Sequence, residues 1–406
     1  MPASSESAAR AATEDAWDFV CPQRILFGVG RVAEAGAAVA ALGCEAWVVA
    51  GGRSAAASGG TVALEASLRA AGLPVRTVAT AAGEPTVDHV AAALAALPVT
   101  GRAGAVIVAL GGGSTIDLAK ALAALATNAA PGDPETAVLD HLEGVGRGLA
   151  IERPPLPLVA IPTTAGTGAE ATRNAVISCP RRRFKKSMRS PLMVPRVAIV
   201  DPALTLTCDR ATTAASGLDC VTQLVESFIC RFRRPLTRAL VLEALPRALA
   251  ALPRVLADPA DIAARAAMSH AALVSGMALT NSGLGLAHGV AAALGVECGA
   301  SHGAACALML PVALRVNRDV AAVDLAMLER AVDPRAPVGD AAAADSFLGR
   351  IESLCVAAGT PRRLRDVGLA AERVGWLAAN SGGASMRGNP VQLDEPALRE
   401  ALAAAW

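Results

Sequence analysis

Apolar residues in the first half of the chain gather in short, continuous runs that end at turn residues. A run that is apolar at every position is typical of a strand buried on both faces of a parallel sheet. Longer segments with helical spacing of small apolar residues lie between these runs. The predicted strands are 24–30 with its turn, 46–50, 75–80, 103–110, 156–161 and 197–200, and the predicted helices are 33–42, 61–71 and 87–97. This alternation predicts an α/β domain whose parallel sheet is covered by helices on both faces.

The pattern changes after Asp201-Pro202, where helical periodicity continues and no convincing strand interrupts it. The helical segments are 211–230, 235–256, 262–279, 284–295, 304–315 and 347–358. A chain of 406 residues is long enough for about two domains. We therefore predict a disordered leader at 1–18, an α/β domain at 19–203 and an all-helical domain at 204–406.

Composition narrows the possible partners of the protein. The formal net charge is +1, which argues against a general attraction to nucleic acid or anionic membranes. The chain has 6 Phe, 4 Trp and no Tyr, which argues against an aromatic platform for stacking single-stranded nucleic acid. The nine cysteines are scattered and never form a CxxC pair, a pattern typical of free thiols in a reducing compartment. We find no apolar signal core near the N-terminus and no stretch of membrane-spanning length, so we expect a cytoplasmic protein.

A glycine-rich turn follows the most apolar predicted strand, in Leu110-Gly-Gly-Gly-Ser-Thr-Ile-Asp-Leu-Ala-Lys120. The backbone N–H groups of 112–115 and the start of the next helix suit a pyrophosphate, because glycines permit a close approach of the anion. The alternative is an ordinary turn in which Ser114 or Thr115 caps the helix. The run is not GxGxxG, so the usual Rossmann fingerprint is absent.

A second loop of small residues, Pro162-Thr-Thr-Ala-Gly-Thr-Gly-Ala-Glu170, follows the next strand. Its threonine hydroxyls suit the ribose, nicotinamide and phosphate edges of the same ligand. By itself the segment could equally be an ordinary loop before a helix. Ligands bind at the carboxyl ends of strands in open α/β sheets, however, and the two loops occupy two such ends.

Four polar residues in the helical half have the chemistry of a metal site. Asp219 and Gln223 are four residues apart and share one helix face, and His288 and His302 are both followed by glycine. One carboxylate and two imidazoles would bind Fe²⁺, Zn²⁺ or a similar ion. Taken singly, Asp219 could instead cap a helix, and His288 could be a core histidine.

These segments together resemble the iron-containing (group III) alcohol dehydrogenase family over nearly the whole chain. The motifs occur in the order of that family: GGGSTIDLAK at 111–120, PTTAGTGAE at 162–170, GLDCVTQ at 217–223, and LGLAHG to SHG at 284–303, with smaller matches at FGVG, GEP and GNP. The resemblance implies the dehydroquinate synthase-like fold, in which an α/β dinucleotide-binding domain precedes a helical metal and substrate domain. It also implies a metal ion and a nicotinamide held between the two domains.

The resemblance assigns roles residue by residue. Asp219, His288 and His302 match metal ligands, and Gln223 stands where the family normally has a fourth ligand, a histidine. A glutamine amide donates more weakly than imidazole, so the affinity for Fe²⁺ or Zn²⁺ should fall. Many members carry a further histidine at the position of Ala292, which is often assigned to proton relay, and this relay is therefore missing here. The predicted cofactor-binding residues are Gly51, Arg53, Gly111, Gly112, Gly113, Ser114, Thr115, Asp117, Lys120, Thr163, Thr164 and Thr167.

Two basic residues bear on the chemistry and on the choice of cofactor. Lys185 falls near a family lysine that points toward the reacting groups, so we include it with His288, His302 and Gln223 as candidate catalytic residues; the alternative is a solvated basic run over 181–186. The second strand ends at Gly51, where NAD-specific enzymes often have a carboxylate, and Arg53 follows. This predicts tolerance of, or preference for, NADP, unless Arg53 merely starts a surface helix.

The expected activity is reversible hydride transfer between NAD or NADP and a small alcohol or aldehyde, assisted by the metal as a Lewis acid. We expect a homodimer or larger homo-oligomer. Three alternatives stay open: a metal-independent reductase resembling maleylacetate reductase; a natural-product tailoring dehydrogenase acting on phosphonoacetaldehyde or a peptide C-terminus; and a non-catalytic subunit with a pathway protein or peptide as its partner.

Overall fold

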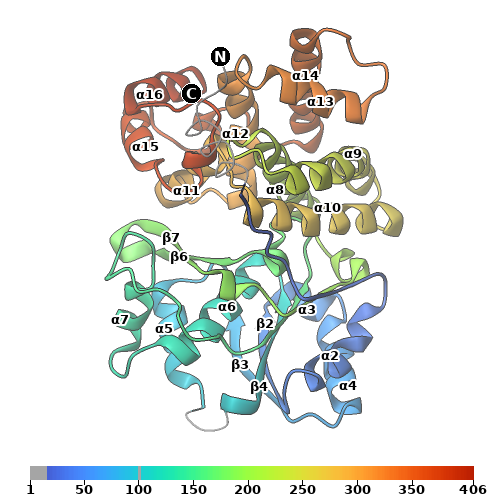
Figure 1. The fold of residues 1–406 in the computed structure, drawn as a ribbon, viewed down its shortest axis with the longest axis vertical. Coiled ribbons are helices and arrows are strands. Elements are labelled where there is room, and N and C mark those ends of the chain that lie inside the picture. The colour runs from blue at the N-terminus through green and yellow to red at the C-terminus, as the bar shows by residue number, and fades with distance from the viewer. Residues whose placement is uncertain (1–15, 99–101) are drawn as a thin grey trace, which may run out of the picture.

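The computed structural model describes residues 16–98 and 102–406, and for residues 53 and 54 it describes the backbone alone. The first half of the chain forms a six-stranded sheet whose order is β1-β8-β5-β4-β2-β3, with all neighbouring strands parallel. These strands are β1 (Arg24–Phe27), β2 (Glu45–Gly51), β3 (Val75–Ala81), β4 (Ala105–Gly111), β5 (Leu158–Pro162) and β8 (Val197–Val200). The predicted fold class, a parallel α/β sheet followed by a helical region, is confirmed (Figure 1).

Strand β4 shows why these runs are apolar at every position, since all of its residues are buried. Successive side chains of a strand point to opposite faces of the sheet. Val106 and Val108 therefore join the core beneath α2 (Ala35–Ala40) and α4 (Gly60–Ala70), whereas Ile107 and Ala109 join the core beneath α5 (Val87–Ala96) and α6 (Gly113–Asn128). The helices of this half are α2 (Ala35–Ala40), α3 (Arg53–Ala57), α4 (Gly60–Ala70), α5 (Val87–Ala96), α6 (Gly113–Asn128) and α7 (Pro134–Asp140).

An antiparallel hairpin, β6 (Asn174–Cys179) and β7 (Phe184–Arg189), lies outside the main sheet. Our alternative interpretation of 181–186 as a solvated basic run holds for Arg181, Arg182, Arg183 and Lys186, which are exposed, but not for Lys185, whose side chain is 9% exposed. Residues 180–182 form a short turn, and Lys185 and Lys186 belong to β7. The charged residues concealed a half-buried strand, because Ala175 and Ile177 of β6 and Met188 of β7 enter the core of the α/β half.

The second half of the chain is helical throughout the residues described after β8. Its helices are α8 (Arg210–Ile229), α9 (Pro235–Ala257), α10 (Ile262–Asn281), α11 (Leu286–Cys298), α12 (His302–Asn317), α13 (Ala322–Val332), α14 (Asp340–Ala358), α15 (Val374–Asn380) and α16 (Glu395–Ala404). Helix α8 is buried along most of its length and packs against α9, α10 and α12 (Figure 1). Among the described helices, α10 is long and apolar enough to cross a membrane, but 67% of its apolar window is buried inside the protein, as in a core helix.

The loop after β5 joins the two halves. Gly168 packs directly on Gly276 of α10: a Cβ at Gly276 would lie 2.1 Å from the Gly168 carbonyl oxygen. Gly166 similarly contacts the backbone of Ser216 on α8. Because neither contact leaves room for a side chain, the loop that follows the sheet is fixed against the helices of the second half.

Candidate active site

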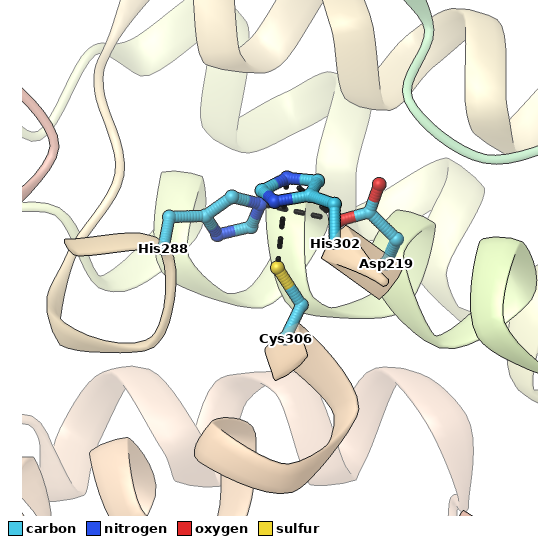
Figure 2. Close-up of side chains that lie close together, drawn as sticks. All are labelled: Asp219, His288, His302 and Cys306. Atoms are coloured by element: carbon cyan, nitrogen blue, oxygen red, sulfur yellow. Dashed lines mark hydrogen bonds and ion pairs between the residues drawn. The ribbon is translucent and has the colours of Figure 1, made fainter. Parts of the chain in front are cut away.

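Three polar side chains that are far apart in the sequence meet where α8, α11 and α12 come together. Asp219 lies on α8, His288 lies in the first turn of α11, and His302 is the first residue of α12. The Oδ1 atom of Asp219 is 3.3 Å from His288 Nε2 and 3.7 Å from His302 Nε2. Figure 2 shows these side chains and that of Cys306 pointing toward one another. Three of the four predicted metal residues therefore form one compact cluster.

Buried polar atoms in this cluster have no hydrogen-bond partner. Within the described residues they include Asp219 Oδ1, His288 Nε2 and His302 Nδ1. Asp219 Oδ1 and His288 Nε2 face each other at ion-pair distance without hydrogen-bond geometry, and these side chains are only 2% and 4% exposed. Buried lone pairs are costly unless a donor or a cation satisfies them. The residues present therefore fit a divalent metal ion, and their carboxylate and imidazole donors suit Zn²⁺ or Fe²⁺.

A second carboxylate fixes the orientation of His288. Glu226 lies two turns after Asp219 on α8 and is buried. Its carboxylate lies 2.7 Å from His288 Nδ1, and it accepts hydrogen bonds from the backbone N–H groups of Ala287 at 2.7 Å and His288 at 3.4 Å. When Nδ1 donates its hydrogen to Glu226, the lone pair of Nε2 is free to face Asp219, as a metal ligand requires. Glu226 does not stand in any of the recognisable motifs, although its spacing from Asp219 puts both residues on one helix face.

Burial and charge set the protonation of the cluster when no ion is bound. Burial opposes the ionisation of Asp219, but His302 and His288 outweigh it and lower its pKa. Burial lowers the pKa of His302 to about 4, so this imidazole is neutral at neutral pH. Burial also opposes protonation of His288, yet its neighbours Cys306, Asp219 and Glu226 raise its pKa well above the usual value. That increase reflects a local excess of negative charge, which a divalent cation would neutralise.

Gln223, the fourth predicted ligand, is buried one turn after Asp219 on α8. Its side-chain oxygen is 2.8 Å from the Ser275 hydroxyl on α10, so its amide is hydrogen bonded to that helix. Ala292 follows His288 by one turn on α11 and brings no polar group. The site therefore differs from the expected set of four ligands at the position of Gln223.

The glycine-rich turn lies between β4 and α6, and the reason for having glycine differs among its three positions. A Cβ at Gly111 would lie 2.3 Å from the Thr115 hydroxyl, and a Cβ at Gly113 would lie 2.6 Å from the Thr167 hydroxyl. Packing inside the protein therefore excludes a side chain at both positions. A Cβ at Gly112 would make only ordinary contacts of 3.4 Å with Thr164, so packing does not demand glycine there. Gly112 is the position at which a ligand explains the glycine best.

The start of α6 is open to an anion. Gly112 is the N-cap residue, and no side chain in the described part of the chain caps this helix. This differs from the alternative in which Ser114 or Thr115 serves as the cap. The end of β2 reaches the same place, since a Cβ at Gly51 would lie 3.0 Å from the Gly111 backbone. The side chain of Arg53 lies outside the described residues.

The two predicted cofactor loops are in contact. The Thr163 N–H donates to the Gly111 carbonyl at 3.0 Å, Thr164 lies beside Gly112, and Thr167 lies beside Gly113. The structure thus brings together the glycine turn, the threonine loop and the end of β2 at the carboxyl edge of the sheet. This is the edge at which open α/β sheets bind ligands.

Asp117 and Lys120 make contacts of another kind. Asp117 accepts a hydrogen bond from the Val176 N–H at 2.9 Å. The fully buried ammonium group of Lys120 donates to the carbonyl of Asn174 at 2.7 Å and to the hydroxyl of Thr172 at 2.5 Å. Both side chains therefore hold the segment that begins β6 against α6. We interpret them as supports of the two loops and not as direct contacts of a dinucleotide.

Lys185 connects the hairpin with the cluster. Its side chain is only 9% exposed and lies 2.5 Å from Glu84 in the turn after β3. Both charges act electrostatically on His302. The hairpin also packs against α11, where Arg183 pairs with Glu297 at 2.6 Å. The lysine, the dinucleotide loops and the metal cluster thus border one region between the two halves of the chain.

Comparison with known proteins decides the family. Residues 22–202 match the family described as "Iron-containing alcohol dehydrogenase", and residues 213–406 match "Fe-containing alcohol dehydrogenase family, C-terminal". The chain belongs to the iron-containing alcohol dehydrogenase family. The resemblance inferred from the motifs is therefore confirmed.

Relatives within this iron-containing alcohol dehydrogenase family extend over most of the chain. It is 32% identical over 373 residues to the "Probable alcohol dehydrogenase EutG" of Escherichia coli K12, covering 92% of this chain and 90% of the relative. It is 33% identical over 302 residues to the lactaldehyde reductase of the same organism, covering 74% of this chain and 76% of that one.

Solved structures of the family share the fold. The alcohol dehydrogenase from Oenococcus oeni superimposes with a TM-score of 0.87 at 27% identity, covering 96% of this chain and all of that one (100%). Sulfoacetaldehyde reductase from Bifidobacterium kashiwanohense, solved in complex with NAD⁺, gives a TM-score of 0.83 at 27% identity and covers 96% and 98% of the two chains. The predicted oxidoreductase class, with a nicotinamide cofactor and a divalent metal as the family's groups, is confirmed.

Proposed function

We propose that this alcohol dehydrogenase transfers a hydride between NAD(P) and a small alcohol or aldehyde, at the junction of the sheet and the helical half. The observation that carries the proposal is the convergence of the glycine turn and the threonine loop with Lys185 and the Asp219 cluster. Relatives named lactaldehyde reductase and sulfoacetaldehyde reductase support a small, polar aldehyde as the substrate class.

In the proposed complex, the dinucleotide lies across the carboxyl edge of the sheet. The backbone at Gly112 and the uncapped N-terminus of α6 would bind the pyrophosphate, because free N–H groups and the helix dipole favour an anion there. The loop bearing Thr163, Thr164 and Thr167 would contact the rest of the cofactor. That loop is fixed against α8 and α10, so it can position the nicotinamide toward the cluster.

The cluster would hold the substrate oxygen. Asp219, His288 and His302 would hold a divalent ion, which when bound would supply Lewis-acid stabilisation of negative charge on the substrate oxygen. With an ion bound, Glu226 would accept the Nδ1 hydrogen of His288 and leave Nε2 free for the ion, and the burial of Asp219 and His288 would limit the access of water. Lys185 places a positive charge near the region where negative charge develops. Because position 292 is alanine, we assign no proton relay to α11.

The test combines binding with turnover. Metal-free protein is titrated with NADH and with NADPH by nicotinamide fluorescence, and each complex is then offered small aldehydes with and without added Zn²⁺ or Fe²⁺. The proposal expects binding of at least one cofactor and aldehyde reduction that depends on the metal. Failure to bind either cofactor would overturn it. The proposed tolerance of NADP, which rests on Gly51 and Arg53, is refuted by a clear preference for NADH.

We also propose that the chain divides near residue 203 and that it acts as a cytoplasmic homo-oligomer. The two family matches support the division, since one ends at 202 and the other begins at 213. Residues 1–15 lie outside the described residues. Small-molecule substrates are the proposed partners, and the comparisons give no support to the tailoring, metal-independent or non-catalytic alternatives over this function.

A further inference from the structure

Cys306 belongs to the cluster, although it lies outside the sequence motifs that contain Asp219, His288 and His302. It follows His302 by one turn on α12 and is fully buried. Its Sγ atom is 3.7 Å from His302 Nε2, and the candidate ligand atoms of Asp219, His288, His302 and Cys306 all lie within 4.8 Å of one another. Figure 2 shows the thiol directed at the two imidazoles. A buried cysteine is often only a small apolar residue, so the geometry of its neighbours must decide.

Three of the six distances between these ligand atoms match the edges of a metal tetrahedron, and all six are within 4.8 Å. Ligands about 2.0–2.3 Å from a zinc ion in tetrahedral geometry are about 3.3–3.8 Å from one another. The measured separations are 3.3 Å from His288 Nε2 to Asp219 Oδ1, 3.7 Å from Asp219 Oδ1 to His302 Nε2, and 3.7 Å from His302 Nε2 to Cys306 Sγ. The unpartnered buried atoms Asp219 Oδ1 and His288 Nε2 are an independent sign that a cation belongs in this space.

Gln223 contributes little to the same geometry. Its amide oxygen accepts a hydrogen bond from the Ser275 hydroxyl at 2.8 Å, so this oxygen already has a partner on α10. A neutral amide would also leave the ion with a single anionic ligand, Asp219. A thiolate at Cys306 would supply a second negative charge and a soft donor without disturbing Ser275.

We propose that Cys306, as a thiolate, is the fourth protein ligand of this metal site in place of Gln223, and that the site therefore prefers zinc to iron. Binding breaks the S–H bond of Cys306, forms a bond from sulfur to the metal and releases one proton to solvent. Thiolate donors favour zinc over harder, oxygen-seeking ions. Four protein ligands would still permit a substrate oxygen, because zinc can expand to five-coordination during a reaction.

This inference rests on the proposed metal cradle, but metal binding can be measured without any turnover. The decisive probe is Co²⁺, whose bond to a thiolate gives a sulfur-to-cobalt charge-transfer band in the near ultraviolet. The variants are Cys306→Ala and Gln223→Ala, and Cys220→Ala is the matched control. Cys220 is also fully buried and is adjacent to Asp219 in the sequence, but it is not part of the cluster.

The proposal expects one Co²⁺ per wild-type chain with the sulfur band, and loss of the band in Cys306→Ala alone. Loss of a residue that hydrogen-bonds a metal ligand lowers metal affinity about 10–100-fold. The proposal expects Cys306→Ala to weaken zinc binding by at least this much. A wild-type protein that binds one Co²⁺ without the band overturns the proposal. A band that survives in Cys306→Ala, or disappears in Cys220→Ala, overturns it as well.

X-ray absorption of the zinc-loaded wild-type protein gives the same answer without any variant. The proposal expects one sulfur at about 2.3 Å from zinc. A shell of nitrogen and oxygen alone, or a wild-type chain that binds neither Zn²⁺ nor Co²⁺, overturns it. The two proposals fail separately: sulfur bound to the metal with no aldehyde reduction overturns the proposed function, whereas reduction with a sulfur-free metal site overturns only the role of Cys306.

Discussion

The carboxylate of Glu226 offers a sharp test of how the site is organised, because it touches His288 but is not a proposed ligand. In Glu226→Gln, the single amide oxygen can still accept a hydrogen bond from the Ala287 N–H, which lies 2.7 Å from the carboxylate in the wild type. The amide nitrogen would then face His288 Nδ1, where the carboxylate now accepts at 2.7 Å. Two donors would oppose each other. His288 would relieve the conflict by moving its hydrogen to Nε2, the atom that faces the site.

A hydrogen on Nε2 removes the lone pair that a metal needs. Loss of an outer-shell partner of a metal-binding histidine typically lowers metal affinity about 10–100-fold. We expect a change of this size for Zn²⁺ in Glu226→Gln, which corresponds to about 1.4–2.7 kcal/mol of binding free energy. The assay is competition for Zn²⁺ with a chromophoric chelator, with circular dichroism to confirm that the variant folds.

The chain provides a matched control in Glu243. This residue forms a comparable pair with His270, at 2.8 Å, but its side chain is 44% exposed and lies outside the cluster. Glu243→Gln should therefore change zinc affinity by less than about twofold, since exposed pairs contribute little. A folded Glu226→Gln protein with zinc affinity within about twofold of wild type would refute the role that we give to Glu226.

Three further predictions concern the cofactor turn, the core and the hairpin. Gly112→Ala should weaken NAD(P)H binding and leave the melting temperature nearly unchanged. Gly113→Ala should destabilise the fold by about 1–3 kcal/mol, because its Cβ would lie 2.6 Å from Thr167. Fluorescence titration measures the first effect and thermal unfolding the second, and two variants that behave alike in both assays would contradict the packing argument. Burial raises the pKa of Glu170 to about 7 from its ordinary 4.5. The wild type should therefore lose up to about 3 kcal/mol of stability relative to Glu170→Gln as the pH rises from about 4.5 through 7. Urea unfolding at several pH values measures this loss, and a difference in unfolding free energy that does not change with pH would count against it. Lys185→Met should lower kcat/KM about 10- to 100-fold. The loss of stability should be small, because the partner of Lys185 is a half-exposed carboxylate. Steady-state kinetics with an unchanged kcat/KM would remove Lys185 from the site.

The sheet could be predicted from the sequence because its strands are buried on both faces. The run at 105–110 is apolar at every position and includes the β-branched residues Val106, Ile107 and Val108, which is typical of a buried strand. The hairpin β6–β7 was not found, because three of the six residues of β7 are Lys185, Lys186 and Arg189, and only the packing of Met188 and Phe184 shows its buried side. A strand with one polar face is hard to distinguish from a solvated loop until its neighbours are known.

The candidate site could be predicted only in part. Asp219, His288 and His302 stand in recognisable motifs, and the structure brings them together. Glu226 and Cys306 were missed, because a glutamate inside a helix and a cysteine among apolar residues carry no signal of their own. Their spacing, two turns after Asp219 and one turn after His302, was the available sign that each shares a helix face with a ligand.

The most direct test of the account follows the hydride itself. NADH or NADPH carrying deuterium at both C4 positions of the nicotinamide is incubated with the zinc-loaded protein and a series of small aldehydes, and the alcohols are examined by mass spectrometry. The account predicts alcohol that carries deuterium on its carbinol carbon, because the transfer is direct from the cofactor to the substrate. Alcohol without deuterium, or no alcohol from any of the aldehydes with either cofactor, would contradict it.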